Sequence, residues 1–233
     1  MCGRFTITVS IDELREYLKE DYDIDLDEKL FDLPRYNVAP GQDVIAIIND
    51  GKKNRVGLLR WGFLPSFAKD EKLAYSMINA KSESLAEKPA YQEAFKSKRC
   101  IILADGFYEW KKDKSDKKPL YIHQKDKSIF PMAGLWSTWS KEDGTKVHTC
   151  TIVTTEANSL MEPIHDRMPV IFDHQTRKQW LNPLEKNIHI LSSLLKPYDS
   201  NLMTYYPVSI LVNSSKNESA LCIKEVQNVE TLI

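Results

Sequence analysis

The segment Met1-Cys2-Gly3-Arg4-Phe5-Thr6-Ile7-Thr8-Val9 places a cysteine just before a run of alternating apolar and polar residues. Such alternation over residues 5–9 is typical of a β-strand with one buried face. We expect this strand to attach Cys2 to a sheet. Removal of Met1 is also expected because cysteine has a small side chain, and Cys2 then carries a free α-amine beside its thiol.

A residue with both groups is a 1,2-aminothiol. An α-amine titrates near ~7.7–8.0 and a thiol near ~8.5, so each is expected to have a usable nucleophilic fraction at neutral pH. The amine can condense with an aldehyde, after which the thiol closes a five-membered thiazolidine ring. Alternatively, the thiol attacks an acyl carbon with the amine as its base, as in N-terminal nucleophile hydrolases. A third interpretation is that Cys2 is only a small core residue, and these few residues do not decide among the three.

The composition is that of an ordinary globular protein, with 233 residues, 42% of them hydrophobic and 28% charged. No run approaches the roughly 18 apolar residues of a membrane span, and the first residues do not resemble a signal peptide. We therefore expect a cytoplasmic protein without a membrane partner. With 32 basic and 33 acidic residues, a nucleic-acid site has to come from a local patch of charge.

The four cysteines, Cys2, Cys100, Cys150 and Cys222, are far apart in the chain. They form no C-x-x-C pair and no spacing of the kind that builds a zinc site. Neither disulfides nor a structural metal are therefore expected. The sequence also lacks a glycine-rich phosphate loop, and we expect no cofactor.

Several elements can be assigned from patterns. Ser10 and Glu13 form a capping box that predicts a helix of about three turns, and the acidic run 20–28 is interpreted as a solvated loop. Asn37 lies on a short extended piece before the turn at Pro40-Gly41. Further strands are expected at 43–49, 53–61, 100–104, 107–112, 120–124, 129–136, 147–155, 170–172 and 205–212, with helices at 173–180 and from after Pro183 to 195.

Two stretches near the middle of the chain combine features of a site. Trp61 to Phe67 is an aromatic loop with few charges, and Asn79 lies among polar residues where a strand ends and a helix begins. Each feature alone is most often structural, the aromatics as core and Asn79 as a helix cap. Together, beside a reactive terminus, they favour a functional site.

Glu109 lies between Tyr108 and Trp110 on an expected strand. Desolvation between two aromatics raises the pKa of a carboxyl group and makes it a proton donor near neutrality, whereas an exposed strand glutamate is inert. The lysine-rich stretch 111–118 that follows is interpreted as a solvated hairpin tip, with phosphate contact as the alternative.

His165 and Asp166 lie in a turn between Pro163 and Pro169, next to Arg167. A lone histidine is usually satisfied by local backbone. Here its charged neighbours and the two prolines that restrict the loop favour a role in a site.

Seven motifs occur in order: MCGRF (1–5), RYNVAPG (35–41), WGFLP (61–65), INAKSES (78–84), ADGFYEW (104–110), IHDRMPV (164–170) and YPVS with VN (206–213). Because of these seven motifs taken together, the chain resembles the SOS response-associated peptidase family. The resemblance implies one β-rich α+β domain over residues 1–233, with a mostly antiparallel, barrel-like sheet and peripheral helices. It also implies a monomeric, lyase-type enzyme that acts without metal on abasic sites in single-stranded DNA.

Members of this family join their N-terminal cysteine to the ring-opened abasic aldehyde as a thiazolidine, and they remove peptide residues that precede the cysteine. Carried onto this sequence, the resemblance assigns catalytic roles to Cys2, Asn79, Glu109 and His165. The positions that match the DNA channel are Arg4, Asn37, Trp61, Phe67 and Lys81. Position 81 is often arginine in the family, so bidentate phosphate binding is lost, and Phe67 stands where tryptophan is common.

Two other functions are compatible with parts of the sequence. Class II glutamine amidotransferases also begin with Cys-Gly after a removed methionine, but the motifs expected to hold glutamine are missing here. A single-stranded DNA-binding module without catalysis is the other alternative. Ammonia release from glutamine distinguishes the first, and DNA binding without a bond that survives denaturation distinguishes the second.

Overall fold

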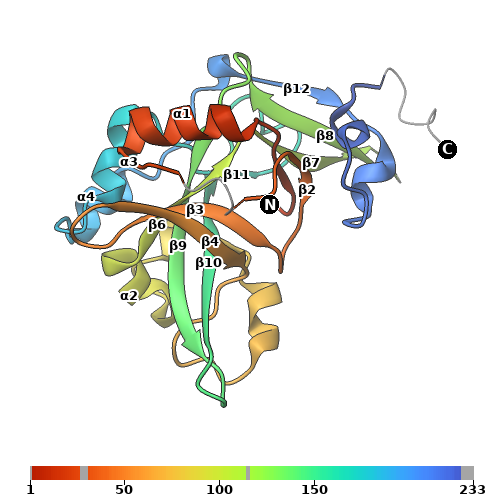
Figure 1. The fold of residues 1–233 in the computed structure, drawn as a ribbon. Coiled ribbons are helices and arrows are strands. Elements are labelled where there is room, and N and C mark those ends of the chain that lie inside the picture. Colours follow the sequence, from red (N-terminus) through yellow and green to blue (C-terminus); the bar gives the residue numbers. More distant parts are fainter. Residues whose placement is uncertain (1, 27–30, 114–115, 227–233) are drawn as a thin grey trace.

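Five strands close on themselves into a barrel in the computed structural model, which describes residues 2–26, 31–113 and 116–226 (Figure 1). Going round the ring, each strand pairs with the next and the last pairs with the first. The order is β3 (Asp43–Asn49), β4 (Asn54–Trp61), β10 (Lys146–Glu156), β9 (Phe130–Ser140) and β6 (Arg99–Ala104). Four of these pairings are antiparallel, and the fifth, between β4 and β10, is parallel.

Alternation along the barrel strands separates two apolar cores. On β6, Ile101 and Leu103 belong to a core that also contains residues from every α-helix, whereas Cys100, Ile102 and Ala104 belong to a second core. Since successive strand residues point to opposite faces, the helix-covered face is the outside of the ring and the second core fills its inside. The helices are α1 (Ile11–Tyr22), α2 (Pro89–Ser97), α3 (His174–Leu181) and α4 (Ile188–Ser193).

A second, fully antiparallel sheet continues from the barrel. Strand β6 runs through Asp105 into β7, so the two sheets are joined without a loop. The order of this sheet is β12 (Met203–Pro207), β8 (Asp116–Gln124), β7 (Gly106–Asp113), β1 (Phe5–Ile7) and β2 (Arg35–Val38). Its inner residues Phe5, Phe107 and Ile122 share the core that fills the barrel, and Cys2 belongs to that same core.

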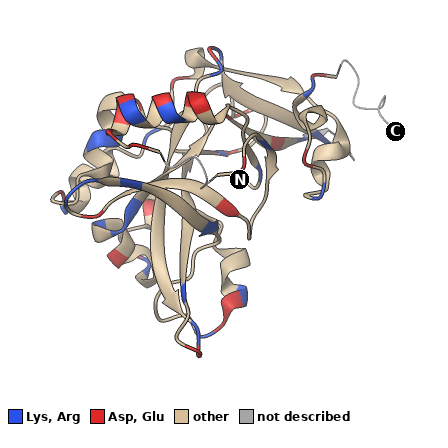
Figure 2. Ribbon diagram, in the orientation of Figure 1, with Lys and Arg blue, Asp and Glu red and all other residues tan. Residues whose placement is uncertain are grey.

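Shorter elements complete the described chain. Strands β5 (Asn79–Lys81) and β11 (Arg167–Pro169) pair with β10. The 3-10 helices are η2 (Glu71–Ser76), η3 (Ser82–Ser84), η4 (Ser200–Leu202), η5 (Ile210–Asn213) and η6 (Ala220–Ile223). No helix within the described ranges is long and apolar enough to cross a membrane. Acidic and basic residues are interspersed along α1 (Figure 2).

The predicted β-rich α+β class is confirmed, as is the capping box. The Ser10 hydroxyl accepts from the Glu13 amide at the start of α1, and the Glu13 carboxylate accepts from the Ser10 amide. The loop expected for the acidic run 20–28 is wrong at residues 20–22, which belong to α1, and residues 27–28 lie outside the described part. Of the stretch 111–118, expected to be a hairpin tip, residues 111–113 and 116–118 are instead paired in β7 and β8, and residues 114–115 lie outside the described part.

Two strand predictions near the C-terminal end are wrong. The strand expected at 170–172 lies three residues earlier, as β11 at Arg167–Pro169. Its position is set by pairing with β10, in which Glu156 lies opposite Arg167. The strand expected to reach 212 ends at Pro207. The chain then turns into η5, where the Ser209 side chain accepts from the Leu211 amide and caps the new turn.

A substitution at Gly106 tests how tightly the second sheet is packed. A Cβ atom at this position would lie 2.2 Å from the Tyr121 hydroxyl oxygen, so we expect Gly106→Ala to lower the free energy of unfolding by about 1–3 kcal/mol. Gly57, also in a strand, has nothing within 4 Å of the same position. Gly57→Ala should leave stability unchanged or raise it by up to about 1 kcal/mol. Equal losses for the two variants in urea unfolding would contradict this packing.

Candidate active site around Cys2

Cys2 lies where the terminal segment enters the second sheet. Phe5 pairs with Phe107, and the Tyr108 amide donates to the Arg4 carbonyl at 2.9 Å, so residues 2–4 run beside β7. The side chain of Cys2 is 0% exposed and packs in the core that fills the barrel. The strand predicted from FTITV therefore does attach Cys2 to a sheet.

Asn79 holds the backbone of Cys2. It is the first residue of β5, which pairs in parallel with β10 through Ile152, and its Nδ2 donates to the Cys2 carbonyl at 2.8 Å. Its Oδ1 is buried, and no described residue donates to it. One end of the Asn79 amide thus fixes the cysteine, and the other end offers an acceptor inside the site.

Glu109 places a negative charge close to the thiol. It lies on β7 opposite Leu120 and is 3% exposed. Burial, and secondly the charge of Glu109, raise the pKa of the Cys2 thiol to about 12. The sequence-based expectation of a usable thiolate fraction at neutral pH is therefore wrong for this state. The thiol is held as S–H and reacts only once a base takes its proton.

His165 lies in the loop between β10 and β11. Its Nδ1 accepts from the backbone amide of Arg167 at 3.0 Å, which is the local backbone contact usual for a lone histidine, and it lies 2.7 Å from a carboxylate oxygen of the exposed Asp166. The same loop is tied to the segment after Asn79, because Arg167 donates to Glu83 at 2.7 Å and to the Thr154 carbonyl at 2.6 Å. The structure therefore brings the histidine loop next to the strand that carries Asn79.

Arg4 and Asn37 bind protein atoms. An Nη1 of Arg4 donates to Asn37 Oδ1 and to the Val212 carbonyl, both at 2.6 Å, and burial lowers the pKa of this guanidinium. Asn37 is fully buried, and its Nδ2 donates to the carbonyls of Ser214 and Asn217. The protein itself uses both polar atoms of this side chain, so the DNA contact predicted for Asn37 would require these hydrogen bonds to open. The pair instead anchors the segment after β12 to the strands beside Cys2.

Trp61 is also internal. It is 1% exposed, its ring centroid lies 5.1 Å from that of Phe5, and its Nε1 donates to the Ile78 carbonyl at 2.9 Å. The predicted stacking of a base on Trp61 therefore does not fit, because neither ring face is open. Trp61 fixes the residue before Asn79 instead. Phe67, at 64% exposure, and the exposed Lys81 do lie at the surface.

Arg167 has a role in this arrangement that the sequence alone did not indicate. Its pairing with Glu83 joins two of the quoted motifs, IHDRMPV and INAKSES. The sequence did offer one indication of this contact, because one motif contains the basic Arg167 and the other contains the acidic Glu83. Residues 212–217 pack over Arg4 and Asn37 and accept hydrogen bonds through their backbone carbonyls. Every residue has such a carbonyl, so the sequence does not indicate which ones are used.

The sequence is similar to a known protein family. The family model described as SOS response associated peptidase (SRAP) matches residues 1–215. The chain belongs to this family. Its SRAP relatives include the Bacillus subtilis abasic site processing protein YoaM, which is 51% identical over 94% of this chain and 96% of its own length. The Escherichia coli abasic site processing protein YedK is 30% identical over 97% of this chain and 100% of its own.

A solved structure supports the SRAP fold as well. The crystal structure of a protein from Bacteroides thetaiotaomicron superimposes with a TM-score of 0.85. The two sequences are 26% identical, and the match covers 97% of this chain and 100% of that one. The barrel with its attached sheet is thus found in a protein of quite different sequence.

The protonation state of Cys2 can be tested by alkylation, which needs the thiolate. In the native protein the rate at Cys2 should keep rising from pH 7 to above pH 10, because the pKa is about 12. In urea the rate should level off above an ordinary thiol pKa of ~8.5. Glu109→Gln removes a negative charge that disfavours the thiolate, so the native profile should move to lower pH. Mass spectrometry of the Cys2 peptide gives the rates, and a native profile that levels off near pH 9 would contradict the assignment.

Proposed function

We propose that this protein recognises abasic sites in single-stranded DNA and bonds to them covalently through Cys2. The observation that carries the proposal is the placement of Cys2 between Asn79, which holds its carbonyl, and Glu109, whose charge acts on its thiol. The names of the relatives YoaM and YedK support abasic DNA as the substrate. The protein is proposed to act as a monomer, associated with the nucleoid while it is bound to DNA.

The proposed reaction begins at the amine. Once Met1 is removed, the α-amine of Cys2 attacks the aldehyde carbon of the ring-opened abasic sugar and forms a carbinolamine. Loss of one water gives an imine. The sulfur then bonds to the imine carbon, and the thiol proton ends on the nitrogen, which becomes the secondary amine of a thiazolidine. The balance of the reaction is one C–N bond and one C–S bond formed, and one water released.

Glu109 is proposed to carry the proton in the ring-closing step. The thiol pKa of about 12 means that closure needs a base, and the carboxylate of Glu109 is the charge that acts on this sulfur. It can accept the S–H proton and return it to the nitrogen. The buried Oδ1 of Asn79 is proposed to accept a hydrogen bond from the Cys2 amine or from the sugar, which satisfies an otherwise costly buried acceptor.

His165 is proposed to act on the abasic sugar. The Arg167 amide donates to its Nδ1, which orients the imidazole and leaves Nε2 as the nitrogen that carries the proton. In that position it can protonate the ring oxygen and favour the open aldehyde. Phe67 and Lys81, which are exposed, are proposed to contact a base and a phosphate of the strand.

The same groups account for the proposed self-peptidase activity. With residues still in front of Cys2, its thiol can attack the preceding carbonyl after Glu109 takes the thiol proton. Protonation of the leaving nitrogen breaks the C–N bond and leaves the preceding peptide as a thioester on the Cys2 sulfur. Water then hydrolyses this thioester, which releases the peptide as a carboxylic acid and leaves the amine and the thiol of Cys2 free. This step would prepare the amine that the DNA reaction requires.

Denaturing electrophoresis with a single-stranded oligonucleotide that contains one abasic site tests the proposal. Wild type should give a band resistant to heat and detergent. Cys2→Ala should abolish this band, and Cys2→Ser should leave at most a labile imine, because the hydroxyl is a poor substitute for sulfur. An uncleavable extension before Cys2 should be as damaging as Cys2→Ala. A stable cross-link in Cys2→Ala would refute the assignment.

A further inference from the structure

Residues 66–76 form an exposed segment between two buried ones. Before it, Phe63 and Leu64 are buried in the core, and after it Met77 is buried as well. Within it, Phe67 is 64% exposed and Tyr75 is 70% exposed. Two large aromatic side chains in one short surface segment are unusual, since most rings of this size are at least partly buried.

The backbone around Tyr75 is fixed. The Phe63 amide donates to the Met77 carbonyl at 3.1 Å, and the Trp61 indole donates to the Ile78 carbonyl. On the other side, Ala74 packs against Gly62, where an added Cβ would meet the Ala74 carbonyl oxygen at 2.9 Å. Tyr75 is therefore presented on a rigid turn, which lowers the entropy cost of binding a partner.

The ring of Tyr75 lies beside Gly41, which has no side chain. A Cβ atom on Gly41 would be 3.6 Å from Cε1 of Tyr75, and Gly41 has a φ of +88°, which favours glycine. The turn at Pro40-Gly41 thus supports one edge of the ring and leaves most of its surface in solvent. A flat ring held in this way is suited to stacking on another flat group.

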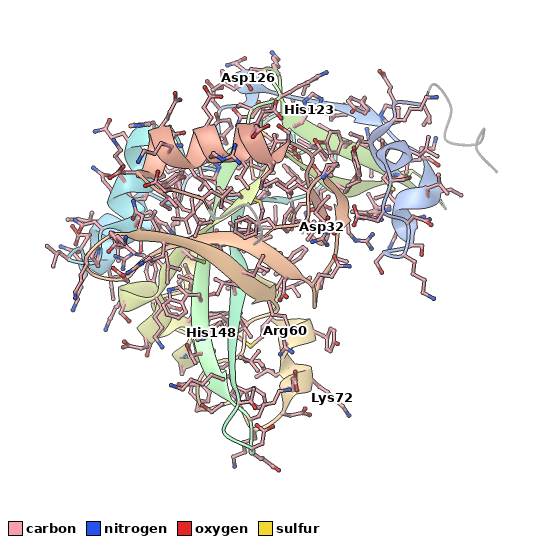
Figure 3. All side chains as sticks on the ribbon, viewed as in Figure 1. Asp32, Arg60, Lys72, His123, Asp126 and His148 are labelled. Carbon is pink, nitrogen blue, oxygen red and sulfur yellow. The ribbon has the colours of Figure 1, made fainter. Side chains whose placement is uncertain are left out.

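The charges around this segment favour an anionic partner. Asp70 caps η2 by accepting from the Lys72 amide at 2.8 Å, and Glu71 forms an ion pair with Arg60 on β4. Both acidic side chains are thus engaged within the protein. Lys69 and Lys72 are exposed, and Figure 3 shows Lys72 near Arg60 at one edge of the molecule.

We propose that Tyr75 is a base-stacking residue for a nucleotide next to the abasic site, and that Lys72 contacts a phosphate of the same strand. This inference rests on the proposed function, since it needs single-stranded DNA at Asn79. Tyr75 is four residues before Asn79, so their Cα atoms are at most about 14 Å apart. A strand whose abasic sugar is at Asn79 can therefore reach the ring with a nearby base.

The test compares affinities for a single-stranded oligonucleotide without an abasic site, measured by fluorescence anisotropy. Tyr75→Ala should weaken binding by about 5- to 150-fold, the usual cost of one lost stacking contact. Tyr75→Phe, which keeps the ring, should bind like wild type. Lys72→Gln should lower the slope of log affinity against log salt by about 0.7, the value for one phosphate on a single strand. The matched control is Tyr205→Ala, because Tyr205 is 40% exposed on the far edge strand β12.

A second measurement separates stacking from any loss of folding. Abasic sites placed at the 5′ end and at the 3′ end of an oligonucleotide leave a neighbouring base on only one side. Tyr75→Ala should slow cross-linking with one of these substrates and leave the other at the wild-type rate. Slowing with both would indicate a disturbed site and overturn the proposal.

Other outcomes are also decisive. Equal affinity of wild type and Tyr75→Ala, while wild type still cross-links, overturns this inference and leaves the proposed function intact. Failure of wild type to cross-link refutes the proposed function itself. A dimer that Tyr75→Ala converts to monomer, with DNA affinity unchanged, would assign the surface to a second copy of the chain instead.

Discussion

The hydrogen bond from Asn79 to the Cys2 carbonyl is the interaction on which the site depends. It joins an element of the barrel, through β5 and β10, to the segment that enters the second sheet through β1. Trp61 fixes Ile78 on one side of this bond, and pairing of β1 with β7 brings Glu109 to the other. The closed barrel therefore holds the Asn79 half of this junction, and the second sheet holds the Cys2 half.

Burial of Cys2 has a chemical consequence. A thiol with a pKa of about 12 is a weak nucleophile at neutral pH, and it is also protected from oxidation and from stray electrophiles. In the proposed reaction the amine therefore acts first, and the sulfur reacts once an imine is formed beside it and Glu109 takes its proton. Under this proposal the site favours aldehydes, which an amine can trap, over electrophiles that react with free thiolates.

Much of the fold and of the site could be predicted from sequence. The hairpin of β3 and β4, the apolar strand β6 and the helix start at Ser10 follow from patterns with a direct physical cause. Cys2, Asn79 and Glu109, far apart in the chain, are brought together as the motifs indicated.

Exposure was harder to predict than location. Trp61 and Asn37 belong to motifs of the site, but a sequence does not distinguish an aromatic ring that stacks on a ligand from one that packs on Phe5. Nor does it show that the amide of Asn37 is used by backbone carbonyls of residues 214 and 217. The ends of β11 and β12 were misplaced because strand pairing, which depends on distant residues, sets them.

The most direct test of the account is the rate of cross-linking of Asn79→Ala with abasic single-stranded DNA. This variant removes the bond that holds Cys2 while both nucleophiles remain, so the account predicts at least a tenfold slower cross-link, with a melting temperature close to that of wild type. Asn201→Ala, on the exposed η4, is the matched control and should react at the wild-type rate. A wild-type rate for Asn79→Ala would contradict the claim that this hydrogen bond positions the reactive cysteine.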